Sequence, residues 1–272
     1  MMFGKHKKEK TESSNLVLDF EYLDKLATDN HNSYVSATPF PHVVIPEFLL
    51  KPSLDTILSQ IPKPNDPDTK WHFFENVKRE DGKITVSKKH QTLDEISLKP
   101  YLRQLFWELN SGSFMKFLQK LTGIQDLIPD PYMFGGGIHH NTRGAFLDVH
   151  LDFNVHPIFN LDRRLNLLLY LTPNYNEDYG GELELWSSDM KTCEKKIVPT
   201  LNTCVIFNTS EKSFHGHPNP VSCPDGMARS SLAMYYYSNG RPEEEKSSTH
   251  STVFQKLPNE EQISSKQIKA TS

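Results

Sequence analysis

The run Asp-Val-His-Leu-Asp-Phe-Asn at residues 148–154 decides the fold that we predict for this chain. Large apolar side chains alternate with polar ones along it, which is typical of a β-strand with one buried face. Successive side chains of a strand point to opposite faces, so His150 and Asp152 are expected to project from the same face. The run therefore predicts a half-buried strand that presents an imidazole and a carboxylate side by side.

An imidazole and a carboxylate held in this way supply two of the three ligands of the facial triad that binds non-haem Fe(II). The third ligand must be a second histidine from elsewhere in the chain. Candidates lie in the run Ser-Phe-His-Gly-His at residues 213–217, and Arg229 then opens a strand-like run at residues 230–237. A histidine and an aspartate two residues apart are common by chance. The order His-x-Asp, distal His and Arg, with strands between them, is much less expected by chance.

In this order of motifs the chain resembles the Fe(II)/2-oxoglutarate-dependent oxygenases, in particular their prolyl-hydroxylase-like branch. The run Tyr-Gly-Gly-Glu-Leu-Glu-Leu-Trp at residues 179–186 is similar to the Gly-Gly-x-Leu turn and strand of that family. Residues 208–215 resemble the loop that delivers its distal histidine. The resemblance covers roughly residues 40–240 in layout and is most specific over residues 130–237.

The resemblance implies that His150, Asp152 and His215 bind Fe(II). His217 competes with His215 for the third position, because it would share the same face if the segment is extended. We prefer His215, which follows a Ser-x pair as the distal histidine of the family often does.

The resemblance also implies a site for the cosubstrate. Arg229 is the candidate for the far carboxylate of 2-oxoglutarate, because a planar guanidinium binds a carboxylate through two hydrogen bonds. Tyr170 matches a position that hydrogen-bonds the cosubstrate in prolyl-hydroxylase relatives. The implied activity is hydroxylation with O2 and 2-oxoglutarate, release of succinate and CO2, and ascorbate as a candidate accessory. The prime substrate stays open between a prolyl or other residue of a protein and a small metabolite.

Two other classes of protein compete with this hypothesis. One is a catalytically silent jelly-roll module that binds a metal or a small acid as a sensor or interaction protein. The presence of every ligand type and the arginine, in order, argues against that class. The other is a zinc hydrolase, which needs a general base near the metal; Glu182 and Glu184 are candidates, but no motif places them there.

Composition and charge limit the binding partners and the cellular compartment that we expect for the protein. The net charge of −4 over 272 residues indicates neither a nucleic-acid partner nor an anionic membrane surface. Cysteines at positions 193, 204 and 223 form neither a zinc pattern nor an obvious disulfide framework, which favours a reducing compartment. No apolar run approaches the length of roughly 20 residues that spans a bilayer. We therefore expect a cytoplasmic protein.

The order of the expected elements predicts an α+β protein dominated by β, with a double-stranded β-helix (jelly-roll) core and supporting N-terminal helices. Helical periodicity precedes a long series of short strands, and both ends are polar. The predicted units are a disordered tail at 1–14, one oxygenase domain at 15–240 with helical support over 15–125 and the jelly-roll core over 130–240, and a disordered tail at 241–272.

Several segments receive a structural rather than a chemical interpretation. The excursion, residues 62–92, is rich in Pro, Asp, Lys and Gly and is expected to form a long loop with at most a short strand or hairpin. Arg163 and Arg164 are expected to be solvated or paired with local carboxylates. Further histidines near the motif are expected to line a pocket without binding metal: His139, His140 and His156.

Overall fold

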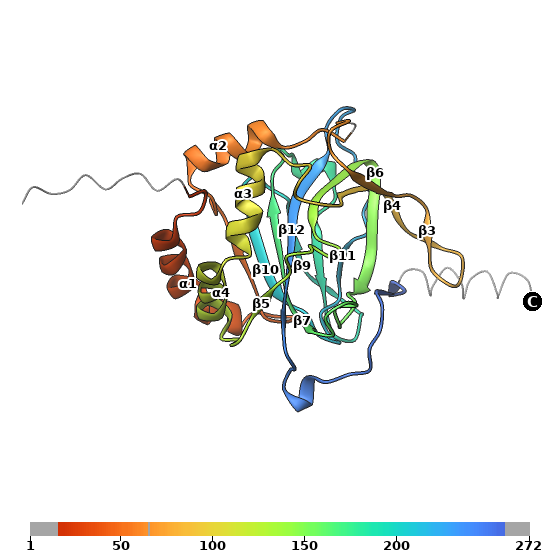
Figure 1. The fold of residues 1–272 in the computed structure, drawn as a ribbon. Helices are drawn as coiled ribbons and strands as arrows, with labels where there is room; N and C mark the ends of the chain where they lie inside the picture. The colour runs from red at the N-terminus through yellow and green to blue at the C-terminus, as the bar shows by residue number, and fades with distance from the viewer. Residues whose placement is uncertain (1–15, 65, 259–272) are drawn as a thin grey trace, which may run out of the picture.

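The computed structural model describes residues 16–64 and 66–258 (Figure 1). Helices dominate the first part of this chain, and strands dominate the part after residue 127. In chain order the elements are α1 (Phe20–Val35), β1 (His42–Ile45), α2 (Lys51–Gln60), β2 (Trp71–Phe74), β3 (Val77–Lys78), β4 (Ile84–Thr92), α3 (Pro100–Leu109), α4 (Gly112–Thr122), β5 (Ile128–Pro129), β6 (Gly137–Leu151), β7 (Asp162–Tyr170), η1 (Glu177–Tyr179), β8 (Leu183–Trp186), β9 (Cys193–Ile197), β10 (Cys204–Asn208), β11 (His215–His217), β12 (Arg229–Ser238), η2 (Glu243–Glu245) and β13 (Val253–Phe254).

Helices α1 and α4 begin at side chains that cap them, whereas α2 and α3 begin with a proline in the first turn. The Asp19 side chain accepts a hydrogen bond from the Tyr22 amide at the start of α1. The Ser111 hydroxyl accepts one from the Phe114 amide at the start of α4, which ends at Gly123 in the left-handed conformation. These side chains satisfy amide groups that have no partner within the helix, and glycine adopts the left-handed conformation without a steric penalty.

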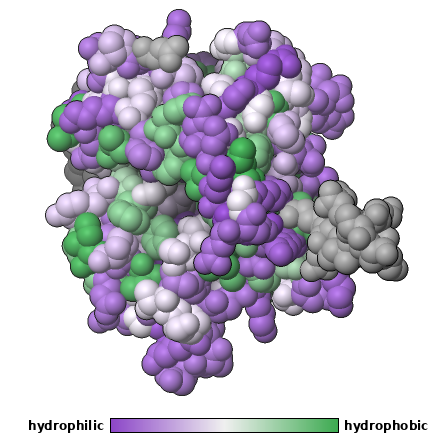
Figure 2. Space-filling model, turned by 90° about the vertical axis from the view of Figure 1, so that its right-hand side faces the viewer, coloured by the Kyte–Doolittle hydropathy of each residue, from purple (hydrophilic) through white to green (hydrophobic). Residues whose placement is uncertain are grey.

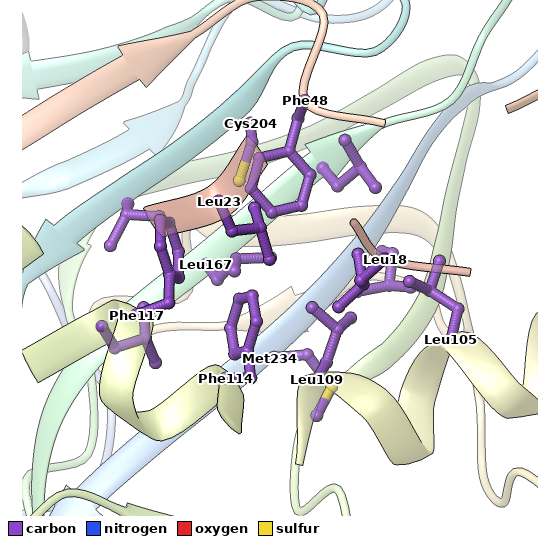
Figure 3. Close-up of a cluster of buried hydrophobic side chains, with 14 of the residues drawn as sticks. Leu18, Leu23, Phe48, Leu105, Leu109, Phe114, Phe117, Leu167, Cys204 and Met234 are labelled. Atoms are coloured by element: carbon purple, nitrogen blue, oxygen red, sulfur yellow. The ribbon is translucent and has the colours of Figure 1, made fainter. Parts of the chain in front are cut away.

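The four α-helices of the described chain cover one face of the sheet (Figure 1). Their apolar side chains meet those of the sheet in a buried cluster (Figure 3). Phe114 and Phe117 of α4 pack there beside Leu167 of β7 and Met234 of β12. Burying a large apolar side chain stabilises a fold by about 1.5–3 kcal/mol. The helical support predicted from periodicity therefore holds the sheet from outside.

Thirteen strands of the described chain form one curled, antiparallel sheet. Its main path runs β1-β10-β7-β12-β6-β11-β8-β9. The helices cover the part built from β1, β10, β7 and β12, and the sheet curls so that β8, β9 and β11 face the inner surface of that part (Figure 1). This arrangement confirms the predicted jelly-roll class with supporting helices.

Strand β6 is common to both halves of the curled sheet. Its first part pairs with β12, where Asn141 lies opposite Arg229. Its last part pairs with β11, where His150 lies opposite His215. Gly144, with φ +83°, lies between these parts. One strand therefore connects the helix-covered half of the sheet to the half that carries the distal histidines.

The alternation of side chains along the strands separates the hydrophobic core from the interior of the jelly roll. On β7, Leu165, Leu167 and Leu169 belong to the core beneath the helices. The intervening Asn166 and Leu168 line an inner cavity. A strand with this period of two thus stabilises the fold with one face and provides polar groups for a site with the other.

Two segments differ from the sequence-based expectation. The excursion contains the long strand β4, which pairs with β2, β3 and β6, rather than at most a short hairpin. The expected disorder of 241–272 is wrong for residues 241–258, which we call the C-terminal strap. Here β13 pairs with β6, and the Gln255 amide donates to the Val149 carbonyl at 2.8 Å.

Other expectations are not tested by this structure. The tail predicted at 1–14 and residues 259–272 lie outside the described residues. Within the part of the chain that is described, no helix is both long and apolar enough to cross a membrane. The cytoplasmic location stays a prediction.

Candidate metal centre

His150, Asp152 and His215 lie together inside the curled sheet. One ligand atom of each residue lies within 4.8 Å of the others. Nε2 of His150 is 3.6 Å from one carboxylate oxygen of Asp152, and Nε2 of His215 is 3.4 Å from the other. His150 and His215 are brought together by the pairing of β6 with β11, and Asp152 follows the end of β6. Strand pairing thus joins His150 to His215, which lies 65 positions further along the chain.

Backbone carbonyl groups fix the orientation of both imidazoles. Nδ1 of His150 is 2.8 Å from the Asp148 carbonyl oxygen, and Nδ1 of His215 is 2.8 Å from that of Ser213. A carbonyl oxygen only accepts, so Nδ1 carries the hydrogen in each ring and the lone pair of Nε2 faces the cluster. Burial lowers the pKa of His215 to about 4, which favours its neutral form. Two neutral imidazoles and one carboxylate fit a divalent metal such as Fe(II).

Arg163 and Asn166 hold the carboxylate of Asp152. The Asn166 amide donates to Oδ2 of Asp152 at 2.7 Å, and Nη2 of Arg163 lies 3.1 Å from the same oxygen. Arg163 also donates from Nε and Nη2 to the Asn166 side-chain oxygen. Its guanidinium lies between the rings of Phe153 and Tyr235, at 4.4 and 3.6 Å from their centroids. These contacts leave Arg163 1% exposed and restrict the position of Asp152.

The charges around Asp152 keep it ionised. Burial by itself raises the pKa of this carboxyl group, but the positive charge of Arg163 and the adjacent His215 and His150 outweigh it. The net effect holds the pKa of Asp152 well below its usual value. The carboxylate is therefore available as an anionic ligand.

An inner cavity of about 60 Å³ extends from the metal cluster toward Arg229. Nε of Arg229 donates to the Gly181 carbonyl at 2.6 Å, and Nη2 donates to the Tyr170 hydroxyl at 3.3 Å. These contacts aim a buried guanidinium into the cavity. Ser231 lies two residues further along β12, on the same strand face, and lines the same cavity.

Tyr170 contacts Arg229 and is not among the residues that line the inner cavity. It is fully buried, and the centroid of its ring is 5.0 Å from the Arg229 guanidinium carbon. Burial raises the pKa of Tyr170, with Arg229 opposing, so the hydroxyl stays protonated. Tyr170 thus contacts the predicted carboxylate-binding arginine rather than the cavity that would hold the cosubstrate.

The two histidines of β11 occupy different places. His215 belongs to the metal cluster, whereas His217 lines the inner cavity together with Arg229. Burial lowers the pKa of His217 well below its usual value, with the positive charge of Arg229 adding to the effect. Nδ1 of His217 has no hydrogen-bond partner among the described residues. His217 therefore offers a polar group to a molecule in the cavity.

The remaining histidines have protein partners. His139 lines the inner cavity and contacts the Gly135 carbonyl at 3.1 Å. His140 lies between the Ser230 hydroxyl at 2.7 Å and the Pro62 carbonyl at 2.8 Å. His156 contacts Asp130 at 3.5 Å and stacks on a phenylalanine ring. Of the three, His139 and His156 line cavities, as expected, whereas His140 connects β6 to β12 and to the segment that follows α2.

A larger cleft of about 700 Å³ opens onto His150 and Asp152 from outside; we call it the outer cleft. Figure 2 shows apolar residues in patches among polar ones on the face that carries β4 and β6. The cleft walls come mainly from β2 and β4, the loop at 132–135, and the C-terminal strap. Phe254 of the strap lies 5.6 Å from His150 between ring centroids. The outer cleft is thus much larger than the inner cavity of about 60 Å³.

Sequence reasoning missed three features of this site. Arg163 does pair with a local carboxylate, as expected, but that carboxylate belongs to the metal cluster. Asn166 was not singled out, although its position before an apolar strand-like run is visible in the sequence. Lys89 lines both the inner cavity and the outer cleft, and nothing in the spacing of the excursion indicates this.

Comparison with known proteins gives a family match that includes the site. Residues 136–237 match the family model of the 2OG-Fe(II) oxygenase superfamily, and this range contains the metal cluster and Arg229. Over these residues the resemblance to the oxygenases, and to their prolyl-hydroxylase-like branch, is confirmed by the family match and by the curated relatives. The family name itself gives Fe(II) and 2-oxoglutarate as its cofactor and cosubstrate.

Curated relatives include the prolyl 3-hydroxylase OGFOD1 of Mus musculus, which is 28% identical over 203 residues. That match covers 73% of this chain and 33% of the mouse protein, so the chain spans about a third of the relative's length. OGFOD1 of Xenopus laevis is 33% identical over 79 residues, which cover 28% of this chain and 15% of the relative.

Solved structures support the fold. A prolyl hydroxylase of Trichoplax adhaerens, in complex with a peptide fragment of a hypoxia inducible factor oxygen degradation domain, superposes with a TM-score of 0.56 at 16% identity, over 84% of this chain and 94% of that chain. A prolyl 4-hydroxylase of Phytophthora capsici gives a TM-score of 0.51 at 18% identity, over 85% and 70%.

Proposed function

We propose that this chain is an Fe(II)- and 2-oxoglutarate-dependent dioxygenase that hydroxylates a prolyl residue of a polypeptide, with release of succinate and CO2. The observation that carries the proposal is the buried cluster of His150, Asp152 and His215 at the end of a cavity that also holds Arg229. The mouse relative, named as a prolyl 3-hydroxylase, supports the hydroxylase activity and the prolyl substrate.

In this proposal the metal is held by Nε2 of His150, Nε2 of His215 and the carboxylate of Asp152. Bound Fe(II) would supply the redox chemistry with dioxygen that the side chains of the protein lack. The protein provides the geometry: carbonyl groups fix both imidazole rings, and Arg163 with Asn166 fixes the carboxylate. His217 remains the competing third ligand, but its place beside Arg229 favours contact with the cosubstrate.

The cosubstrate would lie in the inner cavity with its far carboxylate on Arg229. A fixed guanidinium binds a carboxylate through charge-assisted hydrogen bonds, and Ser231 adds a hydroxyl donor on the same strand face. The Tyr170 hydroxyl and the Gly181 carbonyl accept hydrogen bonds from the arginine and fix its position. We therefore assign Tyr170 a positioning role rather than direct contact with 2-oxoglutarate.

The prime substrate would enter through the outer cleft. Its walls include aromatic side chains, among them Phe74, Phe134, Phe153 and Phe254, which suit the apolar ring of proline and exclude water from the metal side. A polypeptide segment would fit a cleft of about 700 Å³ that opens to the outside. A free amino acid or another metabolite would fill only a part of it.

The test is turnover of 2-oxoglutarate by purified protein supplied with Fe(II), with succinate measured by mass spectrometry. Succinate formation that is absent from the His150→Ala variant would support the proposal without knowledge of the prime substrate. Ascorbate is added in one arm, because we propose that it sustains repeated turnover. Binding of 2-oxoglutarate without succinate formation, with or without ascorbate and proline-containing peptides, would instead indicate the silent binding module.

A further inference from the structure

Lys89 is a cation of the excursion that faces the site from outside the jelly-roll core. It lies on β4, opposite Phe74 of β2 and Asn141 of β6. Its side chain lines both the inner cavity and the outer cleft, so it lies where the two meet.

A local irregularity of β4 turns Lys89, rather than its neighbour, toward the site. The pairing of β4 with β6 shifts register between Ser87 and Lys89. Lys88 between them has φ 52°, in the left-handed region that non-glycine residues rarely adopt. Its side chain is exposed, and its Nζ donates to the Arg143 carbonyl at 3.4 Å. Irregularities of this kind are frequent beside active sites, where they redirect a side chain.

The other two cations of the site already have partners. Arg163 is paired with Asp152 and Asn166, and Arg229 donates to the Gly181 carbonyl. Nζ of Lys89 lies 5.2 Å from the ring centroid of Phe74. Within residues 16–64 and 66–258, no hydrogen-bond acceptor or ion-pair partner is found for this amine.

An amine in this environment is set to bind an oxygen atom. Burial lowers the pKa of Lys89 to about 8, the charge of Asp152 raises it, and Arg163 and Arg229 lower it further. The group is still largely protonated near neutral pH and carries three N–H donors. A partly buried cation without an acceptor is unfavourable, and a ligand that supplies an acceptor gains free energy from the contact.

We propose that Lys89 binds an acceptor oxygen of the prime substrate, a backbone carbonyl next to the residue that is hydroxylated. This inference rests on the proposed function. Lys89 would fix the register of the polypeptide in the outer cleft, while the aromatic walls hold its apolar side chains. A carboxylate of 2-oxoglutarate offers the same acceptor chemistry, but Arg229 and Ser231 already provide for it at the other end of the inner cavity.

Competitive labelling with trace acetic anhydride tests the proposal without turnover. The protein is loaded with Mn(II), and the labelling of Lys89 and Lys88 is compared by mass spectrometry before and after addition of 2-oxoglutarate and then of peptides. The peptide probe is a pool of acetylated, amidated heptapeptides with a central proline. We expect labelling of Lys89 to fall on addition of the peptides, while labelling of the exposed Lys88 stays constant.

Two results of the labelling would overturn the proposal. A fall on addition of 2-oxoglutarate alone would assign Lys89 to the cosubstrate. Equal labelling of Lys89 in every state would show that neither molecule reaches it.

Variants supply a second, independent readout. A charge-assisted hydrogen bond lost on substitution weakens binding by about tenfold or more, so Lys89→Met is expected to raise KM for the peptide pool by that factor. Its kcat should change less, and its calorimetric affinity for 2-oxoglutarate should stay within about twofold. Lys89→Arg should recover part of the loss, and Lys88→Met is the matched control. An unchanged KM in Lys89→Met would contradict the proposal.

The proposed function can fail separately from this inference. Succinate formation by the wild-type protein without peptide reports on the oxygenase activity alone. Protection of Lys89 by peptides in a protein that forms no succinate would support the binding role and reject the dioxygenase.

Discussion

Arg163 and Asp152 form a buried ion pair, with Nη2 of the arginine 3.1 Å from Oδ2 of the carboxylate. The guanidinium lies between two aromatic rings, so it has little freedom to move away. Arg163 thereby fixes the orientation of the Asp152 carboxylate, as the backbone carbonyls of Asp148 and Ser213 fix the orientation of the two imidazoles. The orientation of each member of the metal cluster depends on a neighbour that would not itself bind the metal.

Removal of this arginine should weaken metal binding. In Arg163→Met the carboxylate keeps the hydrogen bond from Asn166 but loses its counter-charge. Loss of a residue that supports a metal ligand typically lowers metal affinity by about 10- to 100-fold, and we expect a loss in this range. Calorimetry with Mn(II) measures it. Arg164→Met, which removes the adjacent ion pair with Glu245 at 3.3 Å, is the control and should retain the wild-type affinity.

Arg229 and Tyr170 should affect the binding of 2-oxoglutarate to different extents. Arg229→Met removes the carboxylate partner, and we expect a loss of affinity of about 100-fold, the upper range for hydrogen bonds to charged groups. Tyr170→Phe removes one neutral hydroxyl that contacts the arginine and should lower the affinity for 2-oxoglutarate by about threefold to tenfold. Titration of the Mn(II)-loaded protein with 2-oxoglutarate gives both values. Equal losses in the two variants would mean that Tyr170 contacts the cosubstrate directly.

Gly216 allows β11 to approach β6 closely. A Cβ atom at this position would lie 2.8 Å from the carbonyl oxygens of Asp148 and Leu147, and backbone atoms cannot move aside as a flexible side chain can. Gly216→Ala should therefore lower the free energy of unfolding by about 1–3 kcal/mol and displace His215 from the cluster. Urea denaturation and Mn(II) affinity measure the two effects.

The control for this substitution is Gly112→Ala at the start of α4. A Cβ atom there meets nothing within 4 Å, so stability should be unchanged or slightly increased. If both alanine variants unfolded at the same urea concentration, the close approach at Gly216 would not matter for stability.

His140 should make the stability of the fold depend on pH. Burial lowers its pKa from 6.5 to about 4, while the bond to the Pro62 carbonyl opposes the shift and His90 adds to it. The folded protein thus favours neutral histidine. Its contribution is fully present above the unfolded pKa, and it is lost as the pH falls from 6.5 toward 4.

The size of the expected stability loss follows from the difference between the unfolded and folded pKa values of His140. Between about pH 7.5 and pH 5 the wild-type protein should lose about 2 kcal/mol more stability than His140→Gln. Unfolding of the metal-free proteins by urea at both pH values isolates this contribution, because the other titrating groups are common to both. Parallel pH profiles would show that His140 titrates normally in the folded state.

The fold could be predicted from sequence because its decisive patterns are local. Alternation along the strands and helical spacing such as that of Leu102, Leu105 and Leu109 depend on residues close in the chain. The His-x-Asp pair is equally local, and the second histidine followed from the order of motifs. These patterns led to the jelly-roll class and to a set of residues that the structure brings together.

The parts that sequence did not predict depend on contacts between distant segments. Lys89 faces the site only because β4 pairs with β6, and the polar composition of the excursion hides that strand. The strap is polar as well, and it is ordered by partners far away in the sequence. Arg241 donates to the Arg163 carbonyl, and the Asn154 amide donates to the Ser248 carbonyl at 2.8 Å.

The outer cleft includes segments that do not carry the metal cluster. The proposed metal ligands and the residues that orient them lie on or beside β6, β7 and β11, at the centre of the sheet. The cleft also takes walls from β2, β4, the loop at 132–135 and the strap, which lie outside those three strands. The segments that add these walls are therefore distinct from the strands that hold the metal cluster. Exchange of the excursion or of the strap between relatives should transfer substrate preference and leave the proposed metal centre intact, so these two segments are the natural targets for redesign.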